Sequence, residues 1–193
     1  MNHKWNEILK TYQHDNTTQQ LIFVKCKETT NVDISMYQKS EYGWKCILDC
    51  PGYIGRNGLG KQVQGDQKTP EGIFNLTSAF GIKDNPGTQM PYVKIHEYLY
   101  WCEDEQYYNT LIDIREKPHS CSGERLVDYG PQYHYGMVLD YNKECIYGKG
   151  TAIFLHCTDQ LPYTEGCIAV EESYMIKILR NAQPGVKICI FSE

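Results

Sequence analysis

The stretch Tyr163-Thr164-Glu165-Gly166-Cys167-Ile168-Ala169-Val170 places a thiol directly after a glycine, at the end of a polar turn. His156 stands eleven positions upstream and closes the apolar run 152–155. This run has the composition of a strand, so the fold can carry the imidazole to the thiol. A nucleophile with an adjacent base is the minimum apparatus for acyl transfer. The two segments therefore predict a strand and a loop that meet at a nucleophilic cysteine.

The thiol of Cys167 needs activation, because a free cysteine has a pKa near 8.5. A helix N-terminus or a nearby imidazolium lowers such a pKa to roughly 3.5–7.5. We expect Cys167 to have both, with His156 as ion-pair partner and a helix beginning soon after the loop. Gly166 leaves room for a substrate carbonyl, and the peptide N–H groups of Gly166 and Cys167 are candidate oxyanion donors. The alternative is a packing cysteine and a structural histidine.

Working outward, length and composition favour one globular domain. At 193 residues the chain can bury a substantial core. Sixteen tyrosines against five phenylalanines suit strands with one wet face, or a groove that binds sugar or peptide. A net charge of -5 argues against nucleic acid or an anionic membrane as partner. No apolar run reaches the roughly 18 residues of a membrane-spanning helix, so we expect no membrane span. The oligomeric state stays open.

The N-terminal segment has the pattern of an amphipathic docking helix. Four large apolar or aromatic residues recur at helical spacing: Trp5, Ile8, Leu9 and Tyr12. Residues 1–12 lack the apolar stretch of a signal peptide. Either the protein stays inside the cell, or an export segment lies outside this chain. We expect residues 1–18 to form a helical extension and residues 19–193 to form the main domain.

Nine cysteines are many for this length, and the number is odd. They follow no repeating spacing, and disulfide frameworks belong mostly to shorter, loop-rich chains. Most are therefore expected to be small buried hydrophobes in a reducing or anaerobic setting. No C-x-x-C pair is present, and Cys46 and Cys50 lack a second pair to complete a metal site. We expect no structural zinc, no other metal and no cofactor.

Runs of β-branched and aromatic residues predict a mainly β domain with few helices. The predicted strands cover 20–26, 32–38, 44–49, 72–76, 92–101, 133–141, 151–158 and 186–191. One late helix is expected at 171–182, with acidic residues at its positive end and Pro184-Gly185 as its stop. The glycine-rich stretch 52–60 lacks the G-K-[ST] of a phosphate-binding loop and favours a bent β connection. The polar segment 102–131 is expected to form a groove wall.

A second motif, residues 65–74, reads Gly-Asp-Gln-Lys-Thr-Pro-Glu-Gly-Ile-Phe. It resembles the G-D-x-K-T-P-E-G-x-F signature of L,D-transpeptidase catalytic domains, the YkuD or ErfK family. Residues 152–156 and 164–170 are similar to that family's histidine strand and S/T-x-G-C loop, in the same order and at similar separation. The resemblance covers about Gln20 to Ile190. It implies a β-sandwich or open-barrel sheet with a few short helices and the cysteine in a groove.

The resemblance also implies roles for individual residues. Cys167 would be the nucleophile and His156 its base. Thr164 would shape the loop or hydrogen-bond near the thiolate, and the backbone around Gly166 would form part of the oxyanion hole. Four residues of the other motif are expected to maintain the fold: Asp66, Lys68, Thr69 and Pro70.

The reaction implied is an acyl transfer on peptidoglycan. Members of the family cleave a stem peptide between its third residue and the following D-alanine, and pass the acyl group from cysteine to the side-chain amine of another stem. Water as acceptor gives carboxypeptidase activity instead. The resemblance therefore implies stem peptides as partners and an extracytoplasmic, cell-wall location.

Five further residues are candidates for the substrate groove. Trp101, Tyr108 and Asn109 fall where this branch of the family has aromatic and polar groove residues. His134 and the adjacent Tyr135 are also candidates for its lining, and a surface strand histidine is the alternative for His134.

The cysteine loop departs from the commoner S/T-H-G-C-x-R/N pattern at two positions. Glu165 replaces the histidine, and Ala169 replaces the arginine or asparagine. The second change removes a donor near the substrate, which affects the expected specificity more than the mechanism. Glu165 would oppose thiolate formation if it faced the site, and we expect it to point to solvent.

Three alternatives to a transpeptidase remain open. The same Cys167–His156 pair can use water, which makes a carboxypeptidase or a peptidase. A catalytically idle cell-wall binding module is the second, with Glu165 and Ala169 as traces of lost activity. A zinc protein with His156, Cys157 and Cys167 as ligands is the third.

Overall fold

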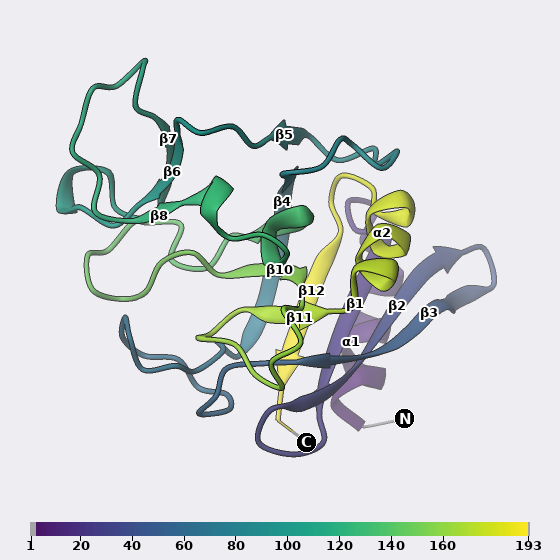
Figure 1. The fold of residues 1–193 in the computed structure, drawn as a ribbon. Coiled ribbons are helices and arrows are strands. Elements are labelled where there is room, and N and C mark those ends of the chain that lie inside the picture. The colour runs from purple at the N-terminus through teal and green to yellow at the C-terminus, as the bar shows by residue number, and fades with distance from the viewer. Residues whose placement is uncertain (1–2, 193) are drawn as a thin grey trace.

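The structure is a computed structural model that describes residues 3–192, and it shows a mainly β chain (Figure 1). In chain order its strands are β1 (Gln20–Cys26), β2 (Asn31–Ser40), β3 (Gly43–Tyr53), β4 (Gly72–Gly81), β5 (Tyr92–Lys94), β6 (Leu99–Cys102), β7 (Thr110–Asp113), β8 (Glu124–Arg125), β9 (Gly136–Leu139), β10 (Phe154–Cys157), β11 (Ile168–Val170) and β12 (Lys187–Phe191). Its α-helices are α1 (His3–Gln13) and α2 (Glu172–Asn181), and short 3-10 turns are η1 (Glu105–Tyr107), η2 (Leu126–Asp128) and η3 (Gln132–His134).

The large sheet closes on itself. Its nine strands run in the order β12-β1-β2-β3-β11-β10-β9-β4-β5, and β12 also pairs with β4. That additional pairing joins the two ends of the sheet into a ring, with β5 attached outside it along the far half of β4. The expected barrel-like, mainly β fold is confirmed.

Alternation along the strands divides the apolar residues between the inside and the outside of this ring. On β1, Ile22 and Val24 belong to the main core, whereas Leu21 and Phe23 face outward to α1. Within β10, Leu155 and Cys157 likewise belong to the main core. Helix α2 contributes Met175, Ile178 and Leu179 to the same core, so one face of this helix closes the barrel.

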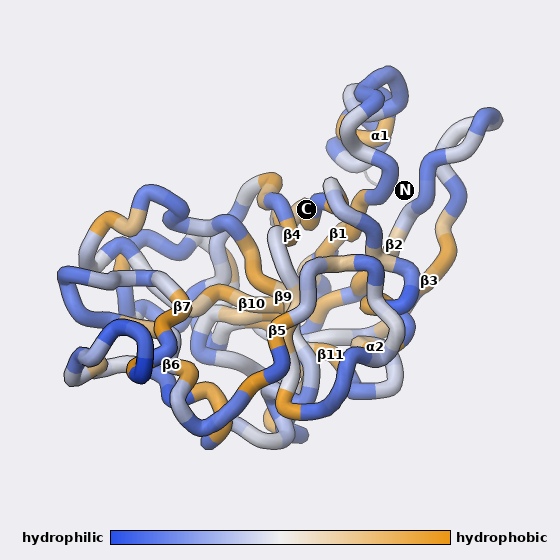
Figure 2. The backbone as a smooth tube through the Cα atoms, turned by 90° about the horizontal axis from the view of Figure 1, so that it is seen from above, coloured by the Kyte–Doolittle hydropathy of each residue, from blue (hydrophilic) through white to orange (hydrophobic). Residues whose placement is uncertain are grey.

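Helix α1 docks on the outer face of β1, as its apolar spacing predicts (Figure 2). Trp5 stacks on Phe23 with 4.8 Å between ring centroids, and Trp44 Nε1 donates a hydrogen bond to the Leu9 carbonyl. The boundary between an extension and a domain at residues 18 and 19 stays a prediction. Within residues 3–192, no helix has both the length and the apolar composition that a membrane crossing requires.

A small three-stranded sheet, β7-β6-β8, stands apart from the ring on the side away from α2 (Figure 1). Its Leu99 and Trp101 pack with Phe80 and Phe154 in a second apolar cluster, outside the barrel. Residues on both faces of β10 are therefore buried. Residues 102–131, the predicted groove wall, leave the large sheet and return to it. We call this segment the excursion.

Strands β7 and β8 were not predicted, and three predicted segments have a different structure from the expected one. The run 92–101 is interrupted by a turn and gives both β5 and β6. The run 133–141 begins as η3 and becomes β9 only from Gly136. Residues 168–170 form strand β11, which pairs in parallel with β10, so a strand and not a helix follows Cys167 directly. The late helix is confirmed at 172–181.

Candidate active site

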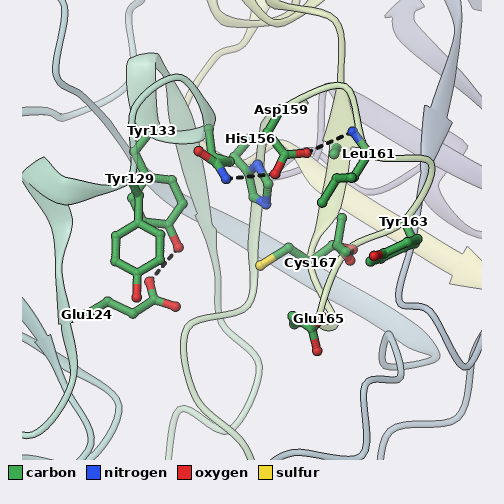
Figure 3. A pocket seen from close by; sticks show the side chains of 12 residues that line it. Glu124, Tyr129, Tyr133, His156, Asp159, Leu161, Tyr163, Glu165 and Cys167 are labelled. Carbon is green, nitrogen blue, oxygen red and sulfur yellow. Dashed lines mark hydrogen bonds between the residues drawn. The ribbon is translucent and has the colours of Figure 1, made fainter.

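Strands β10 and β11 bring His156 and Cys167 to one face of the sheet. The two strands are parallel, with His156 opposite Ala169, and Cys167 is the residue just before β11. The Phe154 N–H donates to the Cys167 sulfur at 3.4 Å, which fixes the thiol beside β10. His156 follows Phe154 by two positions and so faces the same side. Figure 3 shows the imidazole and the sulfur on the wall of one pocket.

Two pockets border the sulfur. The first contains His156, Tyr133 and Asp159, and the second contains Lys61, Glu103 and Gly166. Cys167, Glu124 and Glu165 line both. A molecule in either pocket therefore lies against the same thiol. This arrangement can hold two reactants, one on each side of a nucleophile.

The Cys167 thiol is protonated at rest. It donates to the Ala152 carbonyl at 3.1 Å. Burial raises its pKa to about 12, and the charge of Glu124 acts in the same direction. The Phe154 N–H and the positive charge of Lys61 oppose this rise. The net result is a neutral thiol at pH 7.

The expected lowering of the Cys167 pKa is therefore wrong. Strand β11 stands between the loop and α2, so the helix does not begin at the thiol. Among residues 3–192, the hydrogen bonds of Cys167 Sγ are to Ala152 and Phe154, and none joins it to His156. Burial without a bonded cation favours the neutral form of a thiol.

His156 is buried and neutral as well. Its Nδ1 lies 2.7 Å from the Cys157 carbonyl, which can only accept. Nδ1 thus carries the proton of the neutral ring, and Nε2 keeps a lone pair. Burial lowers the pKa of His156, while the Cys157 carbonyl and Asp159 act in the opposite direction. The ring is in the tautomer that a base for Cys167 requires.

Two threonines hold the cysteine loop. Thr164 Oγ1 donates to the Cys167 carbonyl at 2.7 Å and accepts from the Gly166 N–H at 3.1 Å. Thr69 Oγ1 lies 2.8 Å from the Gly166 carbonyl and accepts from the Gly55 N–H at 2.8 Å. The Gly166 N–H is thus already bonded inside the loop. Thr164 shapes this loop, as the resemblance implied.

The motif at 65–74 is the support of the cysteine loop. Besides the Thr69 bonds, its Lys68 carbonyl would lie 3.0 Å from a Cβ built on Gly166. Gly166 has φ +144°, which side-chain-bearing residues rarely adopt. Close approach and backbone conformation both require glycine here. The motif at 65–74, which was expected to maintain the fold, thus directly supports the loop that carries Cys167.

Thr69→Val is expected to lower the free energy of unfolding by about 1–3 kcal/mol, because it leaves buried partners at Gly55 and Gly166 without their hydrogen bonds. Urea denaturation measures the change. Thr77→Val is the matched control, since its hydroxyl makes one long bond, 3.4 Å to the Val138 carbonyl, on an exposed position. We expect the control to change stability by less than about 0.5 kcal/mol. Equal stability of both variants would contradict this role for Thr69.

Three of the five groove candidates support the strand segment behind the thiol. The side-chain oxygen of Asn109 accepts from the Trp101 indole N–H at 3.0 Å and from the Ala152 N–H at 3.2 Å. The Tyr108 hydroxyl accepts from the Gly150 N–H at 3.1 Å. All three side chains are thereby used to position the segment whose Ala152 carbonyl binds the thiol.

His134 and Tyr135 lie elsewhere. His134 Nδ1 is 2.7 Å from Glu172 at the start of α2, and Tyr135 belongs to the barrel core. In the described chain, none of the five candidates lines either pocket beside Cys167. Their positions give them roles in the fold, and a direct substrate contact stays a prediction from the resemblance.

Sequence reasoning missed two charged residues at the site. Lys61 has a side chain only 3% exposed, and its Nζ is 2.9 Å from Asp66. Glu124 is half-buried and accepts a hydrogen bond from the Tyr133 hydroxyl, and desolvation raises the pKa of Glu124 to about 7. Lys61 stands just before the 65–74 motif, which was the available signal. Glu124 lies in an irregular polar segment, where no sequence pattern indicated a role at the site.

Glu165 points to solvent, as expected. Its carboxylate accepts from the Gln67 amide at 2.7 Å and lies 3.5 Å from Arg56, with 65% of its side chain exposed. Glu165 is not among the groups that raise the pKa of Cys167.

Comparison with solved structures gives neighbours at low identity. Bd1075 of Bdellovibrio bacteriovorus is 18% identical with a TM-score of 0.48, over 90% of this chain and 48% of that one. Pgp2 of Campylobacter jejuni, a helical cell shape determining protein, is 14% identical with a TM-score of 0.47, over 100% and 57%. The Ldtfm–avibactam carbamoyl enzyme is 13% identical with a TM-score of 0.45, over 91% and 49%.

The chain thus spans about half the length of the structures it resembles. No curated protein matches it. The L,D-transpeptidase catalytic domain, YkuD, matches residues 35–190, which include the 65–74 motif, His156 and Cys167. The protein belongs to the YkuD family of L,D-transpeptidase catalytic domains.

Proposed function

We propose that this protein is a cysteine-dependent L,D-transpeptidase acting on peptidoglycan stem peptides. The observation that carries the proposal is that two pockets share Cys167 in their linings. A transpeptidase binds an acyl donor and an amine acceptor at one nucleophile, whereas a hydrolase needs one organic substrate and water. Because its substrate is the cell wall, we propose that the protein acts outside the cytoplasm.

The donor is assigned to the pocket with Lys61 and Gly166. This pocket is lined by Gly166 of the cysteine loop and by Ala152, whose carbonyl accepts from the thiol. The scissile carbonyl then lies against the cysteine loop. The Gly166 N–H donates to Thr164, so we assign the oxyanion donor role to the Cys167 N–H.

In the first half-reaction, the thiol leaves the Ala152 carbonyl and transfers its proton to His156 Nε2. The sulfur attacks the carbonyl carbon of the third stem residue and forms a tetrahedral oxyanion. The imidazolium returns the proton to the departing amine, the C–N bond breaks, and D-alanine leaves. The product is a thioester on Cys167.

In the second half-reaction, an acceptor amine enters where D-alanine departed, on the His156 side. His156 takes a proton from this amine as the amine attacks the thioester, and the thiol is re-formed as the new amide is completed. Asp159 and Glu124 give this pocket a negative character that suits an amine substrate. Ala169 lines the same pocket in place of the arginine or asparagine of other members.

Product analysis tests the assignment. A defined tetrapeptide donor is incubated with the full chain, with and without a diaminopimelate-containing acceptor, and products are identified by mass spectrometry. We expect a cross-linked product together with D-alanine when the acceptor is present. Release of D-alanine at an unchanged rate with no cross-link indicates a carboxypeptidase. No turnover of any stem peptide indicates an idle binding module.

Glu124→Gln is expected to speed alkylation of Cys167 by iodoacetamide at pH 8 by about threefold to tenfold. The ionised carboxylate of Glu124 raises the pKa of the thiol, so its removal increases the small thiolate fraction. Below pH 6 the two proteins should react alike, because the pKa of Glu124 is about 7 and its carboxyl is then mostly neutral.

Glu103→Gln provides the control for this experiment. Glu103 lines the second pocket but is not among the charges that act on the thiol. Its variant should alkylate at the wild-type rate at both pH values. A Glu124→Gln rate equal to the wild-type rate at pH 8 would contradict the electrostatic role of Glu124.

A further inference from the structure

We propose that Cys102, Asp104, His119 and Cys121 form a zinc site in the excursion that walls the pockets. The ligand atoms of Cys102, Asp104 and His119 already lie within 4.8 Å of one another. The Cys121 thiol is a neighbour of the Cys102 thiol and interacts with it. Three potential donors from two chain segments therefore converge on one point, and Cys121 would supply the fourth from beside Cys102.

Sequence spacing explains the convergence. Each segment carries two ligands two positions apart, Cys-x-Asp at 102–104 and His-x-Cys at 119–121. In extended chain, residues two apart face the same side. The antiparallel pairing of β6 with β8 sets Trp101 opposite Glu124. Continued past the strand ends, this register lays residues 121–123 along 102–104, and a Cβ on Gly123 would lie 3.1 Å from the Cys102 Cα.

The hydrogen bonds in this cluster join its potential ligands to one another. The Cys102 thiol lies 3.4 Å from Asp104 Oδ2, and His119 Nε2 lies 2.9 Å from the same oxygen. A divalent ion that displaced the two thiol protons would take over these contacts. Zinc needs ligands at roughly 2.0–2.3 Å, which a small closure of the cluster provides, and two thiolates with one imidazole and one carboxylate suit it.

The groups around the cluster orient its ligands. Ser122 donates to Asp104 from its backbone N–H at 2.8 Å and from its hydroxyl at 2.9 Å. The Tyr107 ring packs edge-on against His119 at 5.1 Å. Such outer partners are typical of metal sites.

The position of the site connects it to the pockets. Glu103 follows the ligand Cys102, and Glu124 begins the strand just after Cys121; both line the second pocket beside Cys167. A bound ion would join the two chain segments that present these carboxylates. This pattern contains no C-x-x-C pair, because its ligands alternate along extended chain.

Metal analysis of the purified full chain tests the proposal. After incubation with zinc and gel filtration, we expect about one zinc per chain by mass spectrometry of the metal. His119→Gln and Cys121→Ser should each lower the zinc content at least tenfold. Cys145→Ser, whose thiol contacts only the Lys143 carbonyl among described residues, should retain it. Cobalt should give a sulfur-to-metal charge-transfer band in the wild type that Cys121→Ser weakens.

A second measurement keeps the proposal testable if the variants fold poorly. In the unaltered chain, zinc should slow alkylation of Cys102 and Cys121 at least tenfold relative to chelator-treated protein, while Cys145 reacts equally in both. Three results would overturn the proposal: no stoichiometric zinc, zinc retained in both ligand variants, or a disulfide between Cys102 and Cys121 in the purified protein.

Discussion

Cys167→Ala is expected to lower the rate of stem-peptide cross-linking by at least about 10⁴-fold, the scale on which enzymes lose activity with their nucleophile. The sulfur is the atom that would form the thioester, and no other thiol borders the two described pockets. The free energy of unfolding should change by about 1–2 kcal/mol, because the substitution removes only two weak sulfur hydrogen bonds, to the Ala152 carbonyl and from the Phe154 N–H. Rates come from quantified products, and stability from urea denaturation.

Cys157→Ala is the matched control for this variant. Cys157 adjoins His156 on β10 but is only 1% exposed and faces the barrel core. Its truncation should cost about 1–2 kcal/mol of stability and leave cross-linking within a few-fold of the wild type. Full activity in Cys167→Ala would rule out the covalent mechanism, whatever the fold.

His156→Gln is expected to lower kcat/KM by about 10²–10⁴-fold, the usual contribution of general acid–base catalysis. The need for this base is greater here than in an ion-paired enzyme, because burial raises the pKa of the Cys167 thiol to about 12. Glutamine keeps a donor for the Cys157 carbonyl but cannot accept and return a proton. The acid limb of the pH profile should report the pKa of His156. Because burial lowers this pKa, wild-type activity should persist somewhat below pH 6.5 and fall as the ring is protonated.

His134→Gln is the control, since His134 contacts Glu172 on α2 and not the thiol. It should retain the activity and the acid limb of the wild-type profile. An acid limb that is unchanged in His156→Gln would show that another group controls the proton, and would remove His156 from the mechanism.

Much of the fold was predictable because it rests on local patterns. The β1 segment has an apolar centre, Leu-Ile-Phe-Val at 21–24, and its predicted bounds are those observed. Helix α2 has acidic residues at its start, an apolar face and Pro184-Gly185 beyond its end, and it appears where expected. Strand β11 is only three residues long. So short an apolar run gives no period from which to distinguish a strand from the start of a helix.

The candidate site was predictable in its members but not in its electrostatics. The motifs at 152–156 and 164–170 predicted that Cys167, His156, Thr164 and Gly166 lie together. The structure brings them to one loop and its neighbouring strand. The pKa of Cys167 depends on burial by the excursion, which comes from a segment more than forty residues away. Glu124 reaches the thiol from that segment, and no spacing along the chain signals such a contact.

The mass of the protein after exposure to a tetrapeptide donor tests the central claim most directly. With no acceptor present, we expect a fraction of the chain to gain the mass of the donor minus D-alanine, with the adduct mapped by proteolysis to Cys167. Addition of the amine acceptor should discharge this adduct into a cross-linked peptide. An adduct on any other cysteine, or cross-linking without a covalent intermediate on Cys167 under single-turnover conditions, would contradict the account.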